Sequence, residues 1–234
     1  FMIFWIILLI LVSICIKYSL ELRKFNSSAE LIQLQNPTNT TINELLNKKS
    51  PLIVHNLASR YLEIDDLTID NLVKNNPGYI IKDNDKHILF SSFLEENQQI
   101  SENPSMIKDL KIEKKLNEIL KTFTNNLSCN LNHKLNIYKG NYKINLNRNN
   151  HDNLIYSQLS GETIFFLFNP KHKNDIINKE NQSIKKWGFK ISLKPGIILS
   201  IPPEWFYIYE IDENSVLSSS YYDNYFTYVY NMIK

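Results

Sequence analysis

The stretch Lys194–Asp212, KPGIILSIPPEWFYIYEID, decides the fold that this sequence predicts. Pro195-Gly196 favours a tight turn into a strand, because glycine accepts a positive φ. The two apolar runs Ile197–Ile201 and Phe206–Ile211 follow this turn and are typical of strands. Pro202-Pro203 separates the runs and fits a strand end, since proline lacks the N–H that a ladder needs. The stretch therefore predicts two strands separated by a proline break.

Short apolar runs of the same kind recur throughout the second half of the chain. Each is rich in Ile, Leu, Phe or Tyr and is bounded by Gly, Pro, Asn or Asp. The other runs are Leu135–Tyr138, Leu154–Leu159, Thr163–Phe168, Lys190–Leu193, Val216–Tyr222 and Tyr225–Tyr230. Such spacing predicts an antiparallel barrel or sandwich. The Tyr-dense segment Ser218–Tyr230 is interpreted as its last two strands, although tyrosines also suit interfaces.

The first half of the chain predicts both helices and strands. Pro51–Val54 is typical of a buried strand. Thr68–Val73 predicts a short helix with Thr68 near its N-cap. Tyr79–Lys82 and His87–Phe90 predict a hairpin. Lys108–Phe123 carries apolar residues at near-helical spacing and predicts a helix with a core-facing stripe.

The N-terminal segment Phe1–Ile16 contains no charged residue. Its length of roughly 24 Å as a helix is a little short of a bilayer core of about 30 Å. Lys17 and Tyr18 suit the membrane interface and would let the helix span. We therefore expect a transmembrane anchor over residues 1–20 and a stalk over 21–49 with a short helix near Ser28–Gln35. A cleaved signal peptide or a buried core helix are the alternatives.

Charges after the expected anchor indicate its orientation. Lys17, Arg23 and Lys24 outnumber Glu21 there. Positive charge just after a span favours a cytoplasmic location for the following domain. The sequence thus predicts a single-pass membrane protein with its main domain on the cytoplasmic side and a lipid bilayer as partner of residues 1–20.

Composition limits the class of protein further. The chain has 234 residues, of which 43% are hydrophobic and 21% charged, and its formal net charge is +2. These proportions exclude a disordered or collagen-like chain. A nearly neutral chain is not expected to bind nucleic acid through a strongly basic face. Its two cysteines, Cys15 and Cys129, exclude a disulfide framework and a cysteine-rich zinc site.

Three segments, taken in order, resemble the cupin-like JmjC family of oxygenases. SPLIVHNL at Ser50–Leu57 resembles the opening strand of that family, and NLIYSQLSGETIFFLFNP at Asn153–Pro170 resembles its strand, turn and strand. Lys194–Asp212 resembles its proline-rich hairpin. The resemblance implies a mainly β double-stranded β-helix (jelly-roll) with a helical N-terminal part, over residues 50–234. It also implies Fe(II), held by two histidines and a carboxylate, with 2-oxoglutarate as co-substrate.

The residues that carry this chemistry in the family are replaced here. The resemblance places the iron ligands at Asn147, Asn149 and Tyr207, and the lysine that pairs with 2-oxoglutarate at Thr163. Amides and a phenol are poor Fe(II) ligands, and a threonine supplies no cation for a dicarboxylate. We therefore expect no metal, no cofactor and no catalysis, with these four residues marking a vestigial pocket.

Two other functions stay open. The first is an Fe(II)/2-oxoglutarate hydroxylase with relocated ligands, for which His151-Asp152 lies nearest to the family motif. Adjacent residues of a strand point to opposite faces, so this pair cannot replace two ligands spaced two residues apart. The second is a domain that binds a small ligand or carbohydrate in a concave polar pocket near the four positions.

The leading hypothesis from the sequence is a membrane-anchored, catalytically inactive JmjC-like domain. We expect it to serve a structural, binding or assembly role with protein partners in a membrane-associated assembly.

Overall fold

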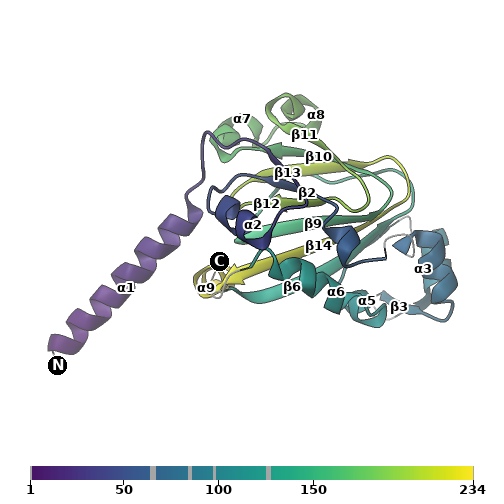
Figure 1. Ribbon diagram of the computed structural model, residues 1–234, viewed down its shortest axis with the longest axis horizontal. Coiled ribbons are helices and arrows are strands. Elements are labelled where there is room, and N and C mark those ends of the chain that lie inside the picture. Colours follow the sequence, from purple (N-terminus) through teal and green to yellow (C-terminus); the bar gives the residue numbers. More distant parts are fainter. Residues whose placement is uncertain (1, 64–66, 84–85, 97–98, 125–127, 234) are drawn as a thin grey trace.

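The computed structural model describes residues 2–63, 67–83, 86–96, 99–124 and 128–233, which form two larger sheets with helices around them (Figure 1). The seven-stranded sheet has, in spatial order, β1 (Ile32–Gln35), β2 (Leu52–His55), β12 (Ile198–Ile201), β9 (Asn153–Ser160), β14 (Ser215–Asn224), β6 (Ser128–Tyr138) and β5 (Gln99–Asn103). The five-stranded sheet has β11 (Phe189–Leu193), β10 (Thr163–Phe168), β13 (Phe206–Ile211) and β7 (Tyr142–Lys143), with β8 (Asn147–Arg148) also paired to β13.

Helices precede and interrupt these strands. In the first half of the chain they are α1 (Met2–Arg23), α2 (Asn39–Leu46), η1 (Ala58–Arg60), α3 (Ile69–Asn75), α4 (Phe90–Glu96), α5 (Pro104–Asp109) and α6 (Glu113–Lys121). In the second half they are η3 (Pro170–His172), α7 (Lys173–Ile176), α8 (Asn181–Ile184), η4 (Lys185–Trp187) and α9 (Tyr225–Ile233). A separate hairpin pairs β3 (Ile80–Asp83) with β4 (Lys86–Leu89), as the sequence predicts.

One face of the larger sheet packs against α3, α5 and α6. Leu72, Met106 and Leu116 from these helices share one core with Ile137 and Val216 from the sheet. The predicted apolar stripe is therefore confirmed. The predicted single helix over Lys108–Phe123 is wrong, because Lys111 has a φ of +57° and separates α5 from α6.

A second core fills the space between the two sheets, and a third lies beneath α7 and α8. The second combines aliphatic side chains with six aromatic ones, among them Tyr156, Phe165 and Trp205. The third joins Ile176 of α7 and Ile184 of α8 to the outer face of β10 and β13. Figure 1 shows these two helices at the β10–β11 end of the molecule.

The strands β12 and β13 belong to different sheets, so the hairpin that the family resemblance implies does not form. β12 pairs with β2 and β9, whereas β13 pairs with β10, β7 and β8. Pro202 and Pro203 offer no N–H to a ladder, and Glu204 has a φ of +69°. These residues carry the chain from one sheet to the other.

The predicted fold class is wrong. The architecture is mixed α/β with two unequal sheets, and a mainly β double-stranded β-helix, or jelly-roll, is not shown. The physical reason is that α3, α5 and α6 form one wall of the main core instead of preceding a β domain. The strands β1 and β5 also extend the larger sheet at its two edges.

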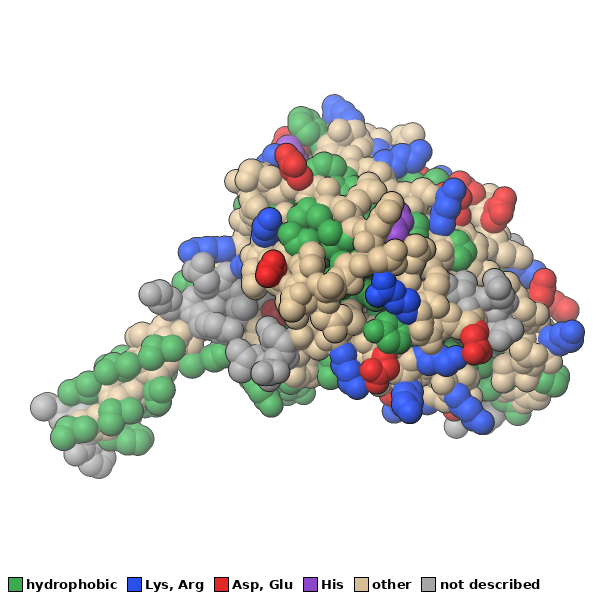
Figure 2. All heavy atoms as spheres, viewed as in Figure 1, with side chains coloured by type: hydrophobic (Ala, Val, Ile, Leu, Met, Phe, Trp, Pro, Cys, Tyr) green, Lys and Arg blue, Asp and Glu red, His purple; other side chains and the backbone are tan. Residues whose placement is uncertain are grey.

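The predicted transmembrane anchor over residues 1–20 is also wrong. Among the described residues, no helix joins the length to the apolarity that crossing a bilayer requires. The uncharged run Phe1–Ile16 reaches only roughly 24 Å as a helix, against a bilayer core of about 30 Å. The single-pass location, with the main domain on the cytoplasmic side, rested on that anchor and is overturned with it. Instead α1 extends away from the sheets and exposes apolar side chains (Figures 1 and 2).

The predicted last strand, Tyr225–Tyr230, is the helix α9. Asn224 starts this helix, because its Oδ1 accepts the backbone N–H groups of Phe226 at 2.8 Å and Thr227 at 3.1 Å. An asparagine at the N-cap satisfies donors that have no partner within the helix. The tyrosine-rich segment is thus divided between a central strand and a helix whose Tyr225 is 66% exposed.

Candidate functional site

Two of the four positions singled out in the sequence lie opposite each other. β8 pairs antiparallel with β13, and Asn147 is in register with Tyr207. Asn147 is exposed, and its Nδ2 donates to the carbonyl of Asn145 at 3.2 Å. Tyr207 is buried. The implied first and third ligand positions are therefore neighbours, but only one of them faces the interior.

Asn149 is buried and bonded to the backbone on all sides. Its Nδ2 donates to the carbonyls of Ile201 at 2.8 Å and Pro202 at 3.0 Å. Its Oδ1 accepts the N–H of His151 at 2.9 Å. The backbone of Asn149 also bonds to Trp205 and Glu204. The side chain thus fixes the crossing between β12 and β13 to the segment that leads into β9.

Thr163 lies apart from the other three positions. It opens β10, whereas Tyr207 is in register with Leu167, four residues further along that strand. At about 3.3 Å per residue this is a separation of roughly 13 Å along the strand. The Thr163 hydroxyl lies 3.3 Å from that of Ser215, which also accepts Gln158 Nε2 at 2.7 Å. Thr163 therefore belongs to a buried polar cluster at the far end of the sheet.

Tyr207 borders a cluster of aromatic rings centred on Tyr156. The ring centroid of Tyr156 lies 5.8 Å from that of Tyr207, 5.9 Å from Tyr209 and 4.9 Å from Phe165. The hydroxyls of Tyr138 and Tyr209 are 2.7 Å apart. Burial, reinforced by neighbouring phenols, raises the pKa values of Tyr156 and Tyr209 above the usual range for tyrosine. These two phenols therefore stay protonated at physiological pH.

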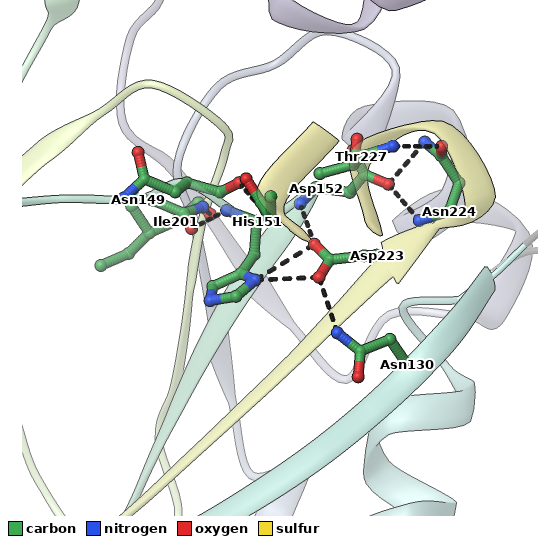
Figure 3. Close-up of polar contacts among 10 residues, drawn as sticks. Asn130, Asn149, His151, Asp152, Ile201, Asp223, Asn224 and Thr227 are labelled. Atoms are coloured by element: carbon green, nitrogen blue, oxygen red, sulfur yellow. Dashed lines mark hydrogen bonds and ion pairs between the residues drawn. The ribbon is translucent and has the colours of Figure 1, made fainter. Parts of the chain in front are cut away.

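A buried polar network adjoins this site, at the start of β9 and the end of β14 (Figure 3). His151 Nδ1 lies 3.1 Å from both carboxylate oxygens of Asp223. Asp223, which is fully buried, also accepts Asn130 Nδ2 at 2.9 Å and the N–H of Asp152 at 3.3 Å. The His151 ring stacks on Tyr221 with centroids 3.7 Å apart. Asp223 therefore ties three separate segments together.

Asp152 forms the other half of the network. Its Oδ2 accepts both the N–H and the side-chain amide of Asn224, at 2.5 and 2.6 Å, and its Oδ1 accepts the Thr227 hydroxyl at 2.7 Å. Burial raises the pKa of Asp152, the Thr227 and Asn224 hydrogen bonds oppose this, and the Asp223 charge adds to it. The carboxylate thus holds the first turn of α9 against the start of β9.

The network has the chemistry of a structural clamp. Asp223 is placed to orient His151 as a general base, and the nearby Cys129 thiol is the nucleophile that such a base would activate. However, burial and the charges of Asp223 and Asp152 raise the pKa of this thiol. A raised pKa keeps that thiol in its unreactive protonated form. Within the part of the chain that the structure describes, no group of three or more His, Cys, Asp or Glu side chains converges to hold a metal ion.

Sequence reasoning missed Asp223, Asn224, Thr227 and Asn130. Three of these residues, Asp223, Asn224 and Thr227, lie about 70 residues along the chain from their partners His151 and Asp152. A short motif cannot report a contact over such a distance. The only signal was the His151-Asp152 pair itself, whose side chains both reach the end of β14.

Comparison with known proteins identified no relative of this chain. No family model matches this chain, and no curated protein is significantly similar to it.

Proposed function

We propose that this chain is a non-catalytic domain that works by binding a protein partner. The observation that carries the proposal is the hydrogen bonding of Asn149 at an implied ligand position. Both its amide N–H groups donate to the carbonyls of Ile201 and Pro202, and its oxygen accepts the N–H of His151. An iron ligand needs a basic lone pair aimed at the ion. The Asn149 amide instead uses its donors and its acceptor in hydrogen bonds to the backbone.

The packing of Tyr207 supports the same reading. Its side chain is only 8% exposed and shares a core with Tyr156, Phe165 and Trp205. Small-molecule sites require a concave space that holds the ligand. Aromatic side chains occupy the interior at this position, which leaves little room for 2-oxoglutarate.

The surface of α1 supports the binding role. Apolar side chains are exposed along this helix, for example Ile3 at 72%, Leu9 at 65% and Leu20 at 63% (Figure 2). Contiguous exposed apolar surface marks sites of interaction with other molecules. We infer that a protein partner covers this helix.

Anaerobic titration of the purified full chain with Fe(II), with and without 2-oxoglutarate, tests the absence of catalysis. We expect no stoichiometric heat of binding under these conditions, and no succinate after air is admitted to the mixture, because oxygen is the oxidant that converts 2-oxoglutarate to succinate. Stoichiometric Fe(II) binding with succinate formation would contradict the proposal. The variant His151→Ala then separates the possibilities, because a site with relocated ligands would lose its iron with this substitution.

A further inference from the structure

A groove of about 390 Å³ lies on the outer side of the smaller sheet, between β8 and the loop that joins α7 to α8. Its volume falls in the range of roughly 300–1,000 Å³ that is usual for small-molecule sites. Leu146, Ile177 and the largely buried Phe206 give it an apolar floor. Ile176 and Ile184 anchor the two helices on the sheet, so the wall of the groove is well supported.

Four asparagines line this groove, and two of them have fixed orientations. Asn147 Nδ2 donates to the Asn145 carbonyl at 3.2 Å, and Asn181 Nδ2 donates to the Ile144 carbonyl at 3.3 Å. Because one amide hydrogen of each is used in this way, the Oδ1 atoms remain as acceptors. Asn178, with a φ of +63°, makes the turn between α7 and α8, a conformation that asparagine tolerates. The groove therefore offers acceptors as well as donors.

The charges of the groove argue against a simple anion site. Arg148 Nη1 lies 3.4 Å from Glu204 Oε2, and its Nε donates to Asn150 at 3.1 Å. Lys179 is exposed, and its ammonium has no ion pair within the described residues. An anion would thus meet one unneutralised cation among amide oxygens that repel it. A hydroxyl group, which donates and accepts, matches the lining better.

We propose that this groove binds a neutral saccharide about two rings long. Hydroxyl groups donate to Oδ1 of Asn147 and Asn181 and accept from Lys179 Nζ, while the C–H faces of the rings lie on Ile177 and Phe206. The inference goes beyond the proposed protein-binding role and does not depend on it. It adds a ligand class and a site on a different face from the aromatic interior.

Two-dimensional ¹H–¹⁵N NMR titration of the full chain tests this site. The probes are cellobiose and N,N′-diacetylchitobiose, with inorganic phosphate as the anionic comparison. We expect at least one disaccharide to shift the backbone amides of residues 145–148 and 177–181 in a saturable manner. Phosphate should leave them in place. Saturable shifts with phosphate alone, or none with either disaccharide, would overturn the proposal.

Matched variants locate the binding. Asn147→Ala should weaken disaccharide binding about tenfold, equivalent to one good hydrogen bond, and Lys179→Ala about threefold. Asn174→Ala and Lys171→Ala alter the same residue types at exposed positions nearby, outside the groove lining, and should bind as the wild type does. If the groove variants bind the disaccharide as tightly as the wild type does, the site is refuted. If the protein binds neither iron nor sugar, the saccharide site is refuted, whereas the proposed non-catalytic role stands.

Discussion

The two sides of strand β13 differ in how their polar groups are used. On the inner side Tyr207 packs with aromatic rings, and the side-chain amide of the neighbouring Asn149 donates to two backbone carbonyls. On the outer side Phe206 forms the floor of a groove where amide oxygens remain open to a ligand. The comparison teaches that a position implied by family resemblance can be absorbed into the core while binding capacity lies one residue away.

The largest expected effect is in the aromatic interior. Phe165→Ala removes a fully buried ring from this core and should lower the free energy of unfolding by about 3–5 kcal/mol. Urea denaturation measures this loss. Phe25→Ala, at a side chain that is 43% exposed, is the matched control and should cost less than about 0.5 kcal/mol. Equal losses in both variants would show that the interior is not closely packed.

The Asn149 amide is the next most sensitive group. Asn149→Ala leaves two buried carbonyls without a donor and should cost about 3 kcal/mol in chemical denaturation. Asn149→Asp keeps the shape but cannot donate when ionised, so it should cost a similar amount at neutral pH. Asn147→Ala, at the exposed position, should cost less than about 1 kcal/mol. If Asn149→Asp matches the wild type, the donor role is refuted.

The shifted pKa values of two carboxyl groups should make the stability of the folded protein depend on pH in opposite directions. Burial raises the pKa of Asp152, so the folded protein holds this proton more tightly than the unfolded chain, and stability is lost as pH rises through the raised pKa. Burial alone would raise the pKa of Glu210, but Lys185 at 2.6 Å and Lys143 hold it below its usual value. Its contribution is therefore lost as pH falls through that lowered pKa.

Melting temperatures between pH 3 and 7 separate these effects. Relative to Asp152→Asn, the wild type should lose stability as the pH rises from about 4. Relative to Glu210→Gln, it should lose stability as the pH falls below about 4. Parallel curves for wild type and Asp152→Asn would remove the argument that this carboxyl is shifted.

The smallest expected effect is in the groove. Lys179→Ala changes an exposed side chain and should alter the free energy of unfolding by less than about 0.5 kcal/mol. Thermal denaturation checks this. A larger loss would mean that groove and fold are not separable, and that the binding defect of this variant has a structural cause.

The sequence predicted elements more reliably than their assembly. The Thr68 N-cap was readable, because a cap acts within three residues, and the structure has Thr68 accepting the Asn71 N–H at 3.3 Å. Ile32–Gln35 was expected within a short helix, yet it forms β1 through parallel pairing with Leu52–His55. Similarly, nothing local indicates that β12 and β13 join different sheets. Pairing between distant segments decided these outcomes.

The candidate site was predicted only as a set of positions. Asn147 and Tyr207 were two of the four positions singled out, and they are in register across β8 and β13. The role of Asn149 could not be read, because its carbonyl partners lie 52 and 53 residues away. The groove could not be predicted for the same reason, since Asn178 comes from the loop after α7 and Asn181 from the start of α8, a region outside the predicted strands.

The place of β14 has a consequence for synthesis of the protein. It lies between β9 and β6 in the larger sheet, yet it follows every other strand in the chain. While the ribosome is still producing residues 215–224, β9 and β6 each lack a neighbour on that side. Unpaired strand edges invite association with other chains. A nascent chain stalled before β14 should therefore depend on chaperones far more than the finished molecule does.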